Sequence, residues 1–285
     1  MLEDKTYSAR SIRVMIDKLN ACRDAYYNRA APIVSDAEYD KLYDELEQAE
    51  KITGIIMSNS PTQTVGYEVN SSLKKVKHSH PMLSLAKTKD VAEFIKYCNN
   101  KPSIVSLKMD GLTVLLTYEN GELIQAETRG NGEIGEDITS NAKVFDNVPV
   151  TIPYKQHLEI EGEAIIAYSD FESINEGLPS SEKYSNPRNL ASGSVRQLDS
   201  GITARRHIKF VAWKVLCLTE ITDDKKLNDF ADRLAFVDEL GFDIVPFYRV
   251  ANASEVAEAV DRLKTWADLK QYPYDGFVHT YRDIK

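Results

Sequence analysis

The sequence contains few cysteines and no long hydrophobic run. Its 285 residues include 3 cysteines, Cys22, Cys98 and Cys217, which are odd in number and far apart. That pattern is typical of a reducing compartment and offers no CxxC pair for a structural zinc site. No apolar run approaches the ~18 residues that a membrane helix needs. The first residues also lack the cationic stretch and apolar segment of a signal peptide. We therefore expect a cytoplasmic protein that does not enter a membrane.

The sequence also lacks an excess of positive charge. It has 35 Lys and Arg against 44 Asp and Glu, for a net charge of -9 and a pI near 5.2, which argues against a protein that simply coats DNA. Residues 182–214 are the exception, with seven cationic residues against two acidic ones. A solvated surface is the simplest interpretation of such a stretch, and contact with phosphates is the alternative.

Length and pattern predict two folding units. In the first unit, apolar residues recur at helical spacing, and Ser35 followed by Glu38 predicts a capping box at the start of a second helix. The stretch from Ser58 to Gly66 has the composition of a loop. We therefore expect a small helical domain over residues 1–58 and a second domain over residues 59–285.

The second unit alternates in the manner of strands. Asn120-Gly121 between two apolar stretches predicts a tight hairpin turn. Further strands and two late helices are expected, which together predict an α+β domain built on antiparallel sheet. The expected strands cover residues 104–108, 112–118, 122–129, 158–167, 209–216 and 274–281, and the expected helices cover residues 226–240 and 255–267.

Lys108-Met-Asp-Gly111 lies between two of these strands. A lysine at the inner end of a strand is partly desolvated, which favours the neutral amine and makes it a usable nucleophile. Asp110 would project to the same side, and Gly111 would let the backbone approach a ligand. Taken alone the pattern is weak, because a lysine that ends a strand is usually an ordinary surface residue.

Three further clusters carry polar chemistry. Residues 128–139 contain three glycines beside Arg129, which suits either a phosphate or sugar contact or simply a flexible hairpin loop. Glu159, Glu161 and Glu163 alternate along a strand and share one face, which is usually solvated but could bind ribose hydroxyls or a metal. Residues 186–197 hold two arginines separated by small residues.

In this order, the motifs resemble the adenylation domain of bacterial NAD-dependent DNA ligases. The residues before them resemble the small helical domain and the following link of the same enzymes. The resemblance covers residues from about 20 to 280, and its specificity comes from the series of motifs. The matching segments are Tyr26, residues 36–40, 60–63, 65–66 and 80–85, Lys108-Met-Asp-Gly111, residues 128–130, 135–139, 161–163, 186–189 and 193–199.

This resemblance implies a nucleotidyltransferase domain of the ATP-grasp-like DNA ligase type and a defined reaction. Lys108 attacks the α-phosphate of NAD, releases nicotinamide mononucleotide (NMN) and forms a lysyl-AMP intermediate. AMP then passes to a DNA 5′-phosphate, and a neighbouring 3′-hydroxyl displaces it to seal the nick. Magnesium neutralises charge in these steps. The implied partners are NAD, magnesium and nicked DNA, the last bound weakly by this chain, which we expect to be a monomer.

The resemblance also implies roles for individual residues. Asp110 supports the nucleophile as a second catalytic residue, Arg129 and Glu163 hold the AMP sugar, and Asp275 joins Glu163 on the metal side. The remaining expected contacts to the cofactor are Arg188 and Arg196 for phosphate of DNA or NAD, Tyr26, Asp36, Tyr39 and Asp40 for the nicotinamide end, and Ser84 with Leu85.

The chain departs from the family pattern at several positions. Ser106 stands where the family has glutamate beside adenine, and Thr280 stands where it has lysine, unless Arg282 or Lys285 substitutes. Tyr27 and Asn131 also differ. The final lysine motif and the OB, zinc-finger, helix-hairpin-helix and BRCT parts of the family are not found in the sequence. An NAD-binding protein that has lost efficient chemistry is therefore the alternative function, and a general DNA-binding module is disfavoured by the acidic charge.

Overall fold

The computed structural model describes residues 7–27, 33–63, 72–83, 85–218 and 228–284. The side chains of residues 24–27, 36, 37, 217 and 218 also lie outside the described part. Within these limits, no helix is both long enough and apolar enough to cross a membrane.

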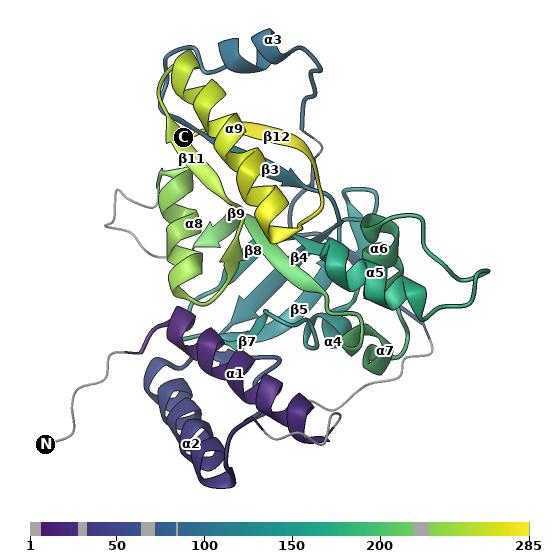
Figure 1. Ribbon diagram of the computed structural model, residues 1–285. Helices are drawn as coiled ribbons and strands as arrows, with labels where there is room; N and C mark the ends of the chain where they lie inside the picture. Colours follow the sequence, from purple (N-terminus) through teal and green to yellow (C-terminus); the bar gives the residue numbers. More distant parts are fainter. Residues whose placement is uncertain (1–6, 28–32, 64–71, 84, 219–227, 285) are drawn as a thin grey trace, which may run out of the picture.

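Helices and strands are interspersed along the described chain (Figure 1). The helices are α1 (Ala9–Tyr27), α2 (Asp36–Thr53), α3 (Val91–Lys96), α4 (Thr139–Ala142), α5 (Tyr168–Glu176), α6 (Pro187–Val195), α7 (Ser200–Ala204), α8 (Phe230–Glu239) and α9 (Ala253–Lys270). The strands are β1 (Ile56–Met57), β2 (Lys75–Lys77), β3 (Ser103–Met109), β4 (Leu112–Glu119), β5 (Glu122–Thr128), β6 (Ile134–Glu136), β7 (Pro149–Thr151), β8 (Leu158–Ile165), β9 (Lys209–Leu218), β10 (Asp243–Ile244), β11 (Phe247–Val250) and β12 (Tyr274–Tyr281).

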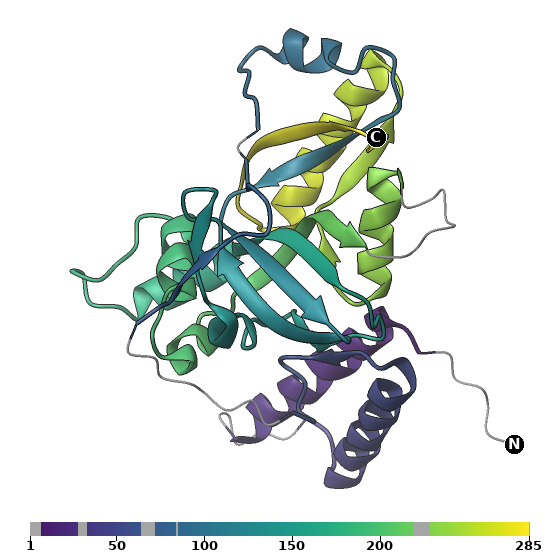
Figure 2. The same cartoon turned by 180° about the vertical axis from the view of Figure 1, so that it is seen from behind.

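The two helices expected at the N-terminus are α1 and α2, which pack together beside β7 (Figures 1 and 2). Ile12, Ile16 and Leu19 are buried against Leu46 of α2 in a core of their own. The predicted capping box is confirmed: the Ser35 side chain accepts a hydrogen bond from the Glu38 amide, and the Glu38 carboxylate accepts one from the Ser35 amide. Local sequence therefore determines both the helical face and the helix start.

The helical pair is joined to the rest of the molecule by specific contacts. Arg13 of α1 forms an ion pair with Asp243 of β10, and the Asn20 side chain donates to the Asn59 carbonyl at 2.9 Å. Met57 packs in the helical core while its short strand β1 pairs with β7 of the main sheet. The expected domain boundary after residue 58 therefore lies just after the end of β1. We propose this position as the division between the two domains.

The main sheet has the strand order β1-β7-β5-β4-β8-β9-β10 among the described residues. Its central pairs are antiparallel, as expected. The predicted hairpin turn is confirmed between β4 and β5, where Asn120 and Gly121 have φ of 53° and 81°, the conformation that an Asn-Gly turn favours. A hydrophobic core beneath this sheet includes Val114, Ile160 and Phe210, and α6 packs against it through Leu190.

A second sheet has the order β11-β3-β12 and is antiparallel throughout its described pairs. Helix α9 crosses it in Figure 1 and packs on it through Val256 and Leu263. Both late helices were expected with slightly different bounds. The helix expected from residue 226 begins at Phe230, because Asp229 caps it by accepting the amides of Ala231 and Asp232. The other extends to residues 253–270 after its cap, Asn252.

Candidate active site

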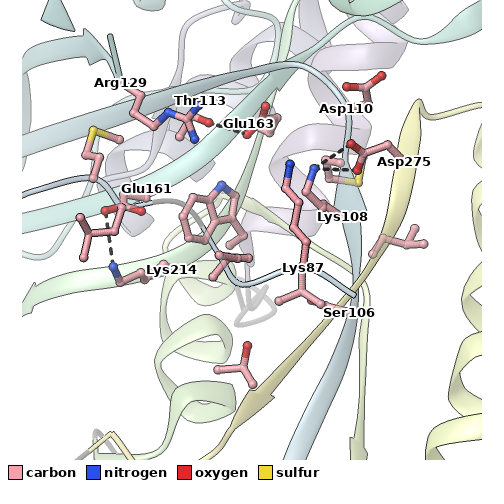
Figure 3. A pocket seen from close by; sticks show the side chains of 18 of the residues that line it. Lys87, Ser106, Lys108, Asp110, Thr113, Arg129, Glu161, Glu163, Lys214 and Asp275 are labelled. Atoms are coloured by element: carbon pink, nitrogen blue, oxygen red, sulfur yellow. Dashed lines mark hydrogen bonds and ion pairs between the residues drawn. The ribbon is translucent and has the colours of Figure 1, made fainter. Parts of the chain in front are cut away.

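A cleft of about 690 Å³ lies between the two sheets. Side chains of β3 and β12 form one wall, and side chains of β4, β8 and β9 form the other (Figure 3). Residues 81–83, 85 and 87, which precede α3 in the chain, cross the opening. The cleft therefore contains groups from segments that are far apart in the sequence.

Lys108 lies on β3 with its side chain about one-third exposed, at 34%. Its ammonium donates to both carboxylate oxygens of Asp275, at 2.7 and 2.8 Å. Asp275 faces Lys108 because the register of β12 shifts between Tyr274 and Gly276, where a bulge inserts one extra residue opposite β3. The sequence predicted a partly desolvated amine; in the structure this amine is held in an ion pair, so a proton must leave it before it can act as a nucleophile.

Asp110 follows directly after β3 and also lines the cleft. Its carboxylate accepts a hydrogen bond from Arg188 at 2.7 Å, and this bond raises the pKa of the Arg188 guanidinium. Position 111 requires glycine, because a Cβ atom there would lie 2.1 Å from the carbonyl oxygen of Ala164 on β8. The glycine therefore allows β4 to begin against β8, which brings the two walls of the cleft together.

Glu163 lies on β8 and is only 8% exposed. Burial raises the pKa of its carboxyl group from 4.5 to about 7, against the hydrogen bond from Thr113 and the positive charges of Arg188 and Lys108. The Thr113 hydroxyl donates to it at 3.1 Å. Arg129, at the end of β5, lines the same side of the cleft (Figure 3). An arginine and a carboxyl group at this position can bind the hydroxyl groups of a sugar.

The glutamates of β8 are not on a solvated face, which was the simplest interpretation of their spacing. Glu159, Glu161 and Glu163 are 4%, 2% and 8% exposed. Glu161 lies 3.5 Å from the ammonium of Lys214 and 2.8 Å from Nε2 of His80. The register between β8 and β9 shifts at Glu161, so that the strand segment Trp213–Lys214 turns both of its side chains into the cleft.

The segment across the opening, residues 78–87, is called the strap below; within it Ser84 lies outside the described residues. The strap is tied to the main sheet at its first residues. His78 is buried, with Nδ1 at 2.8 Å from Glu127 and Nε2 at 2.9 Å from the Arg129 carbonyl. Next to it, His80 contacts Glu161, and the Met82 amide donates to the Gly132 carbonyl at 2.9 Å.

The structure brings most of the expected site residues to the cleft. Its lining includes seven of them, together with the departing positions: Leu85, Lys108, Asp110, Arg129, Glu163, Arg188 and Asp275, with Ser106 and Thr280. Arg282 pairs with Asp229 at 2.7 Å, so it does not replace a lysine at position 280, and Lys285 is outside the described residues.

Other expected residues lie elsewhere. Arg196 forms an ion pair with Glu136 at 2.7 Å and is not part of the cleft lining. In α2, Tyr39 packs on the helical core and Asp40 is exposed, and neither lines the cleft. Ser84 and the side chains of Tyr26 and Asp36 lie outside the described part of the chain.

The expected magnesium can be tested against the carboxylates of the cleft. Glu163 and Asp275 both line it, and no group of three or more potential metal ligands occurs among the described residues. Mg²⁺ usually keeps several waters and is held by one or two carboxylates together with substrate phosphates. The two carboxylates fit that mode of binding, and they do not form a cage made only of protein ligands.

Sequence reasoning missed several residues of the cleft. Lys87 and Trp213 line it but stand in no motif that pointed to a site, and Lys214 was noted only as part of the cationic stretch 182–214. His80 belonged to a segment that was compared only as a link, and its contact with Glu161 depends on the fold. The only signal for Lys87 was its place two residues after the matched segment 80–85.

Comparison with known proteins assigns almost all of the chain to two family domains. Residues 70–285 match the family described as "NAD-dependent DNA ligase adenylation domain", and residues 5–66 match "DNA ligase-like, N-terminal NAD+-binding domain". The DNA ligase of Lachnoclostridium phytofermentans is 46% identical over 274 residues, which cover 96% of this chain and 41% of that protein. The DNA ligase of Ruminiclostridium cellulolyticum is 46% identical over 280 residues, which cover 97% and 42%, and that of Campylobacter lari is 40% identical over 274 residues, which cover 92% and 41%. The chain thus spans about two-fifths of the length of these relatives. This chain belongs to the NAD-dependent DNA ligase family and carries its NAD+-binding and adenylation domains.

Proposed function

We propose that this chain transfers AMP from NAD to Lys108. The observation that carries the proposal is the Lys108–Asp275 ion pair, which lies in one cleft with Arg129 and Glu163. A lysine amine, a proton acceptor in contact with it and a pair of groups suited to a ribose are what a lysyl-AMP reaction requires.

The reaction balances with these groups. The Lys108 ammonium gives a proton to Asp275, with which it already shares two hydrogen bonds, and the proton then passes to solvent. The neutral amine attacks the α-phosphorus of NAD, and a P–N bond forms while the P–O bond to the NMN phosphate breaks. The electron pair of the broken bond leaves with NMN. The attacking nitrogen then loses one of its two protons to solvent, and the phosphoramidate keeps one N–H.

The neighbouring residues position the nucleotide. Arg129 and Glu163 would hold the ribose of AMP, while the Asp110–Arg188 pair supports the phosphate side of the cleft. Magnesium, when bound near Glu163 and Asp275, would neutralise charge on the phosphates. Arg196 would contact phosphate of DNA or NAD from outside the cleft.

The helical pair would bind the nicotinamide end of NAD through Tyr26, Asp36, Tyr39 and Asp40. Asp36 and Asp40 are four residues apart and begin α2, so they share its first two turns. Because Tyr39 and Asp40 do not line the cleft, the proposal includes an approach of the helical pair while NAD is bound. Ser84 and Leu85 of the strap would contact the same nucleotide.

The later steps of ligation are part of the same proposal. AMP would pass from Lys108 to a DNA 5′-phosphate, and an adjacent 3′-hydroxyl would displace it to join the strands. We propose that the chain works as a monomer in the cytoplasm, with nicked DNA bound weakly because of the net charge of -9.

Intact-mass spectrometry after incubation with NAD and magnesium tests the proposal. One AMP should be added from NAD and none from ATP, and Lys108→Ala should remain unmodified. The adduct should be lost in acid or hydroxylamine, because it is a phosphoramide. If Lys108→Ala still gains AMP, or if ATP is the better donor, the assignment of this chemistry is wrong.

A second candidate function is NAD binding without efficient chemistry. Ser106 and Thr280 favour it, because both line the cleft with short neutral side chains where the family has a carboxylate and an ammonium. Tight NAD binding by calorimetry, without an AMP adduct on prolonged incubation, would support this second function over the first.

A further inference from the structure

Most cations that line the cleft are already neutralised by the protein. Three of them pair with carboxylates that line the same cleft: Lys108 with Asp275, Arg188 with Asp110, and Lys214 with Glu161. Lys87 and Arg129 also line it, and neither has a carboxylate partner within the part of the chain that the structure describes. These two side chains can therefore meet an anionic ligand without first breaking an ion pair.

Contacts before and after Lys87 in the chain hold this residue at the cleft. Before it, His80 contacts Glu161 and the Met82 amide donates to the main sheet. After it, Asp90 caps α3 by accepting the amides of Ala92 and Glu93. Lys87 lies between these anchors, and Figure 3 shows its side chain directed toward the end of the cleft that holds Lys108.

Arg129 lies at the other edge of the cleft, beside Glu163 and Glu161 (Figure 3). The two unpaired cations thus serve different parts of a bound dinucleotide. Arg129 is next to the carboxyl groups that suit a sugar, and Lys87 is next to the nucleophile, where the phosphates must lie for attack.

The proposed reaction creates a need for charge at that end. Lys108 must become neutral before it attacks, so the phosphates lose one positive neighbour. At the same time the departing NMN phosphate gains a negative charge as the P–O bond breaks. A further cation placed beside the departing oxygen would stabilise this charge more strongly in the transition state than in the ground state.

We propose that Lys87 is a further catalytic residue, which binds the NMN phosphate of NAD and stabilises it as it leaves. The inference rests on the proposed transfer of AMP to Lys108 and adds a residue to that step. Lys87 stays an ammonium throughout: it donates hydrogen bonds to the oxygens of the departing phosphate and exchanges no proton with Lys108. In the reverse direction it holds NMN for attack on lysyl-AMP.

Kinetics of the full 285-residue chain test the role. Loss of a charge-assisted hydrogen bond predicts a fall of about 10- to 100-fold in the rate of AMP addition from NAD for Lys87→Ala. Lys87→Arg should recover most of that rate. Lys89→Ala is the matched control, because Lys89 is an exposed lysine two residues after Lys87 that does not line the cleft. In the reverse reaction, Lys87→Ala should raise the KM for NMN by a similar factor.

Binding separates this role from the proposed function. In a Lys108→Ala background, which cannot react, adding Lys87→Ala should weaken NAD binding by about tenfold and change AMP binding by less than about twofold. Equal losses for NAD and AMP, or no loss for NAD, would overturn the role of Lys87. Absence of any AMP adduct on the wild-type chain would instead count against the proposed function, and the NAD and AMP affinities would still decide whether Lys87 binds the NMN phosphate.

Discussion

Replacing Glu163 by glutamine should make the protein more stable at neutral and alkaline pH. Burial raises the pKa of this carboxyl group from 4.5 to about 7 in the folded protein. Glutamine has nearly the same shape and can still accept the hydrogen bond from Thr113, but it never becomes charged. The substitution therefore removes the cost of a buried carboxylate and leaves the packing of β8 in place.

The direction in which stability changes with pH follows from the raised pKa of Glu163 in the folded state. Below pH 4.5 the group is protonated in both the folded and the unfolded state, so its contribution to stability is fully present. Between 4.5 and about 7 the unfolded chain ionises first, and the folded state loses stability relative to it. Above about 7 the loss is complete, and a rise from 4.5 to about 7 corresponds to about 3.4 kcal/mol at 1.36 kcal/mol per pKa unit.

Urea unfolding at a series of pH values from about 4.5 to 8 measures this difference. The difference between the free energies of unfolding of Glu163→Gln and of the wild type should increase by about 3 kcal/mol, in favour of the variant, from the lowest to the highest pH of the series. Glu239→Gln, which changes an exposed carboxylate of α8, is the control and should run parallel to the wild type. If Glu163→Gln also runs parallel, Glu163 does not titrate near neutral pH and the reasoning from burial is refuted.

Three further outcomes follow from the site and the charge. Asp275→Asn should slow AMP addition from NAD by about 100-fold or more, because Lys108 loses the base in contact with it; intact mass against time measures this. Asp40→Asn should reduce labelling by NAD while leaving the transfer of AMP from AMP-DNA to Lys108 intact, because the nicotinamide end is absent from that substrate. Sealing of a nicked duplex by the 285-residue chain should be slow and should fall steeply from 50 to 200 mM salt, because the net charge is -9.

Each of these outcomes has a control. An unchanged rate for Asp275→Asn across the pH range would remove Asp275 from the proton transfer. Asp44→Asn, one turn further along α2, is the matched control for Asp40→Asn, and equal effects of the two would indicate a general charge effect. A nick-sealing rate that does not change with salt would contradict the electrostatic argument.

Local patterns predicted much of the fold. The Ser35–Glu38 capping box, the Asn120–Gly121 turn, and strands β3 and β4 all depend on residues close together in the sequence, and all are present. Lys108 lies inside β3 and not between the two strands. The α+β class and its mainly antiparallel sheets followed from the same alternation, although β10 pairs with β9 in parallel. The order of the strands did not, because β3 lies between β11 and β12, which come about 140 and 170 residues later in the chain.

The site was less accessible to sequence reasoning. Its individual residues were found through the series of motifs, but the Lys108–Asp275 contact depends on a bulge in β12, and the orientation of Trp213 depends on another in β9. Neither irregularity leaves a periodic signal. The alternation of Glu161 with its neighbours correctly predicted a shared face, but whether a face is solvated or buried depends on what packs over it, here the strap.

The division of the cleft between two sheets has a consequence for how such an enzyme can change over time. The wall with Lys108 rests on a core that includes Leu107 and Leu263, and the wall with Glu163 rests on a core that includes Val114 and Ile160. Because the two cores are largely distinct, a substitution that reshapes the wall with Glu163 leaves the support of Lys108 largely in place. Under the proposed function, donor preference can therefore change in a lineage, or be altered by design, through the wall with Glu163, while the wall with Lys108 keeps its arrangement.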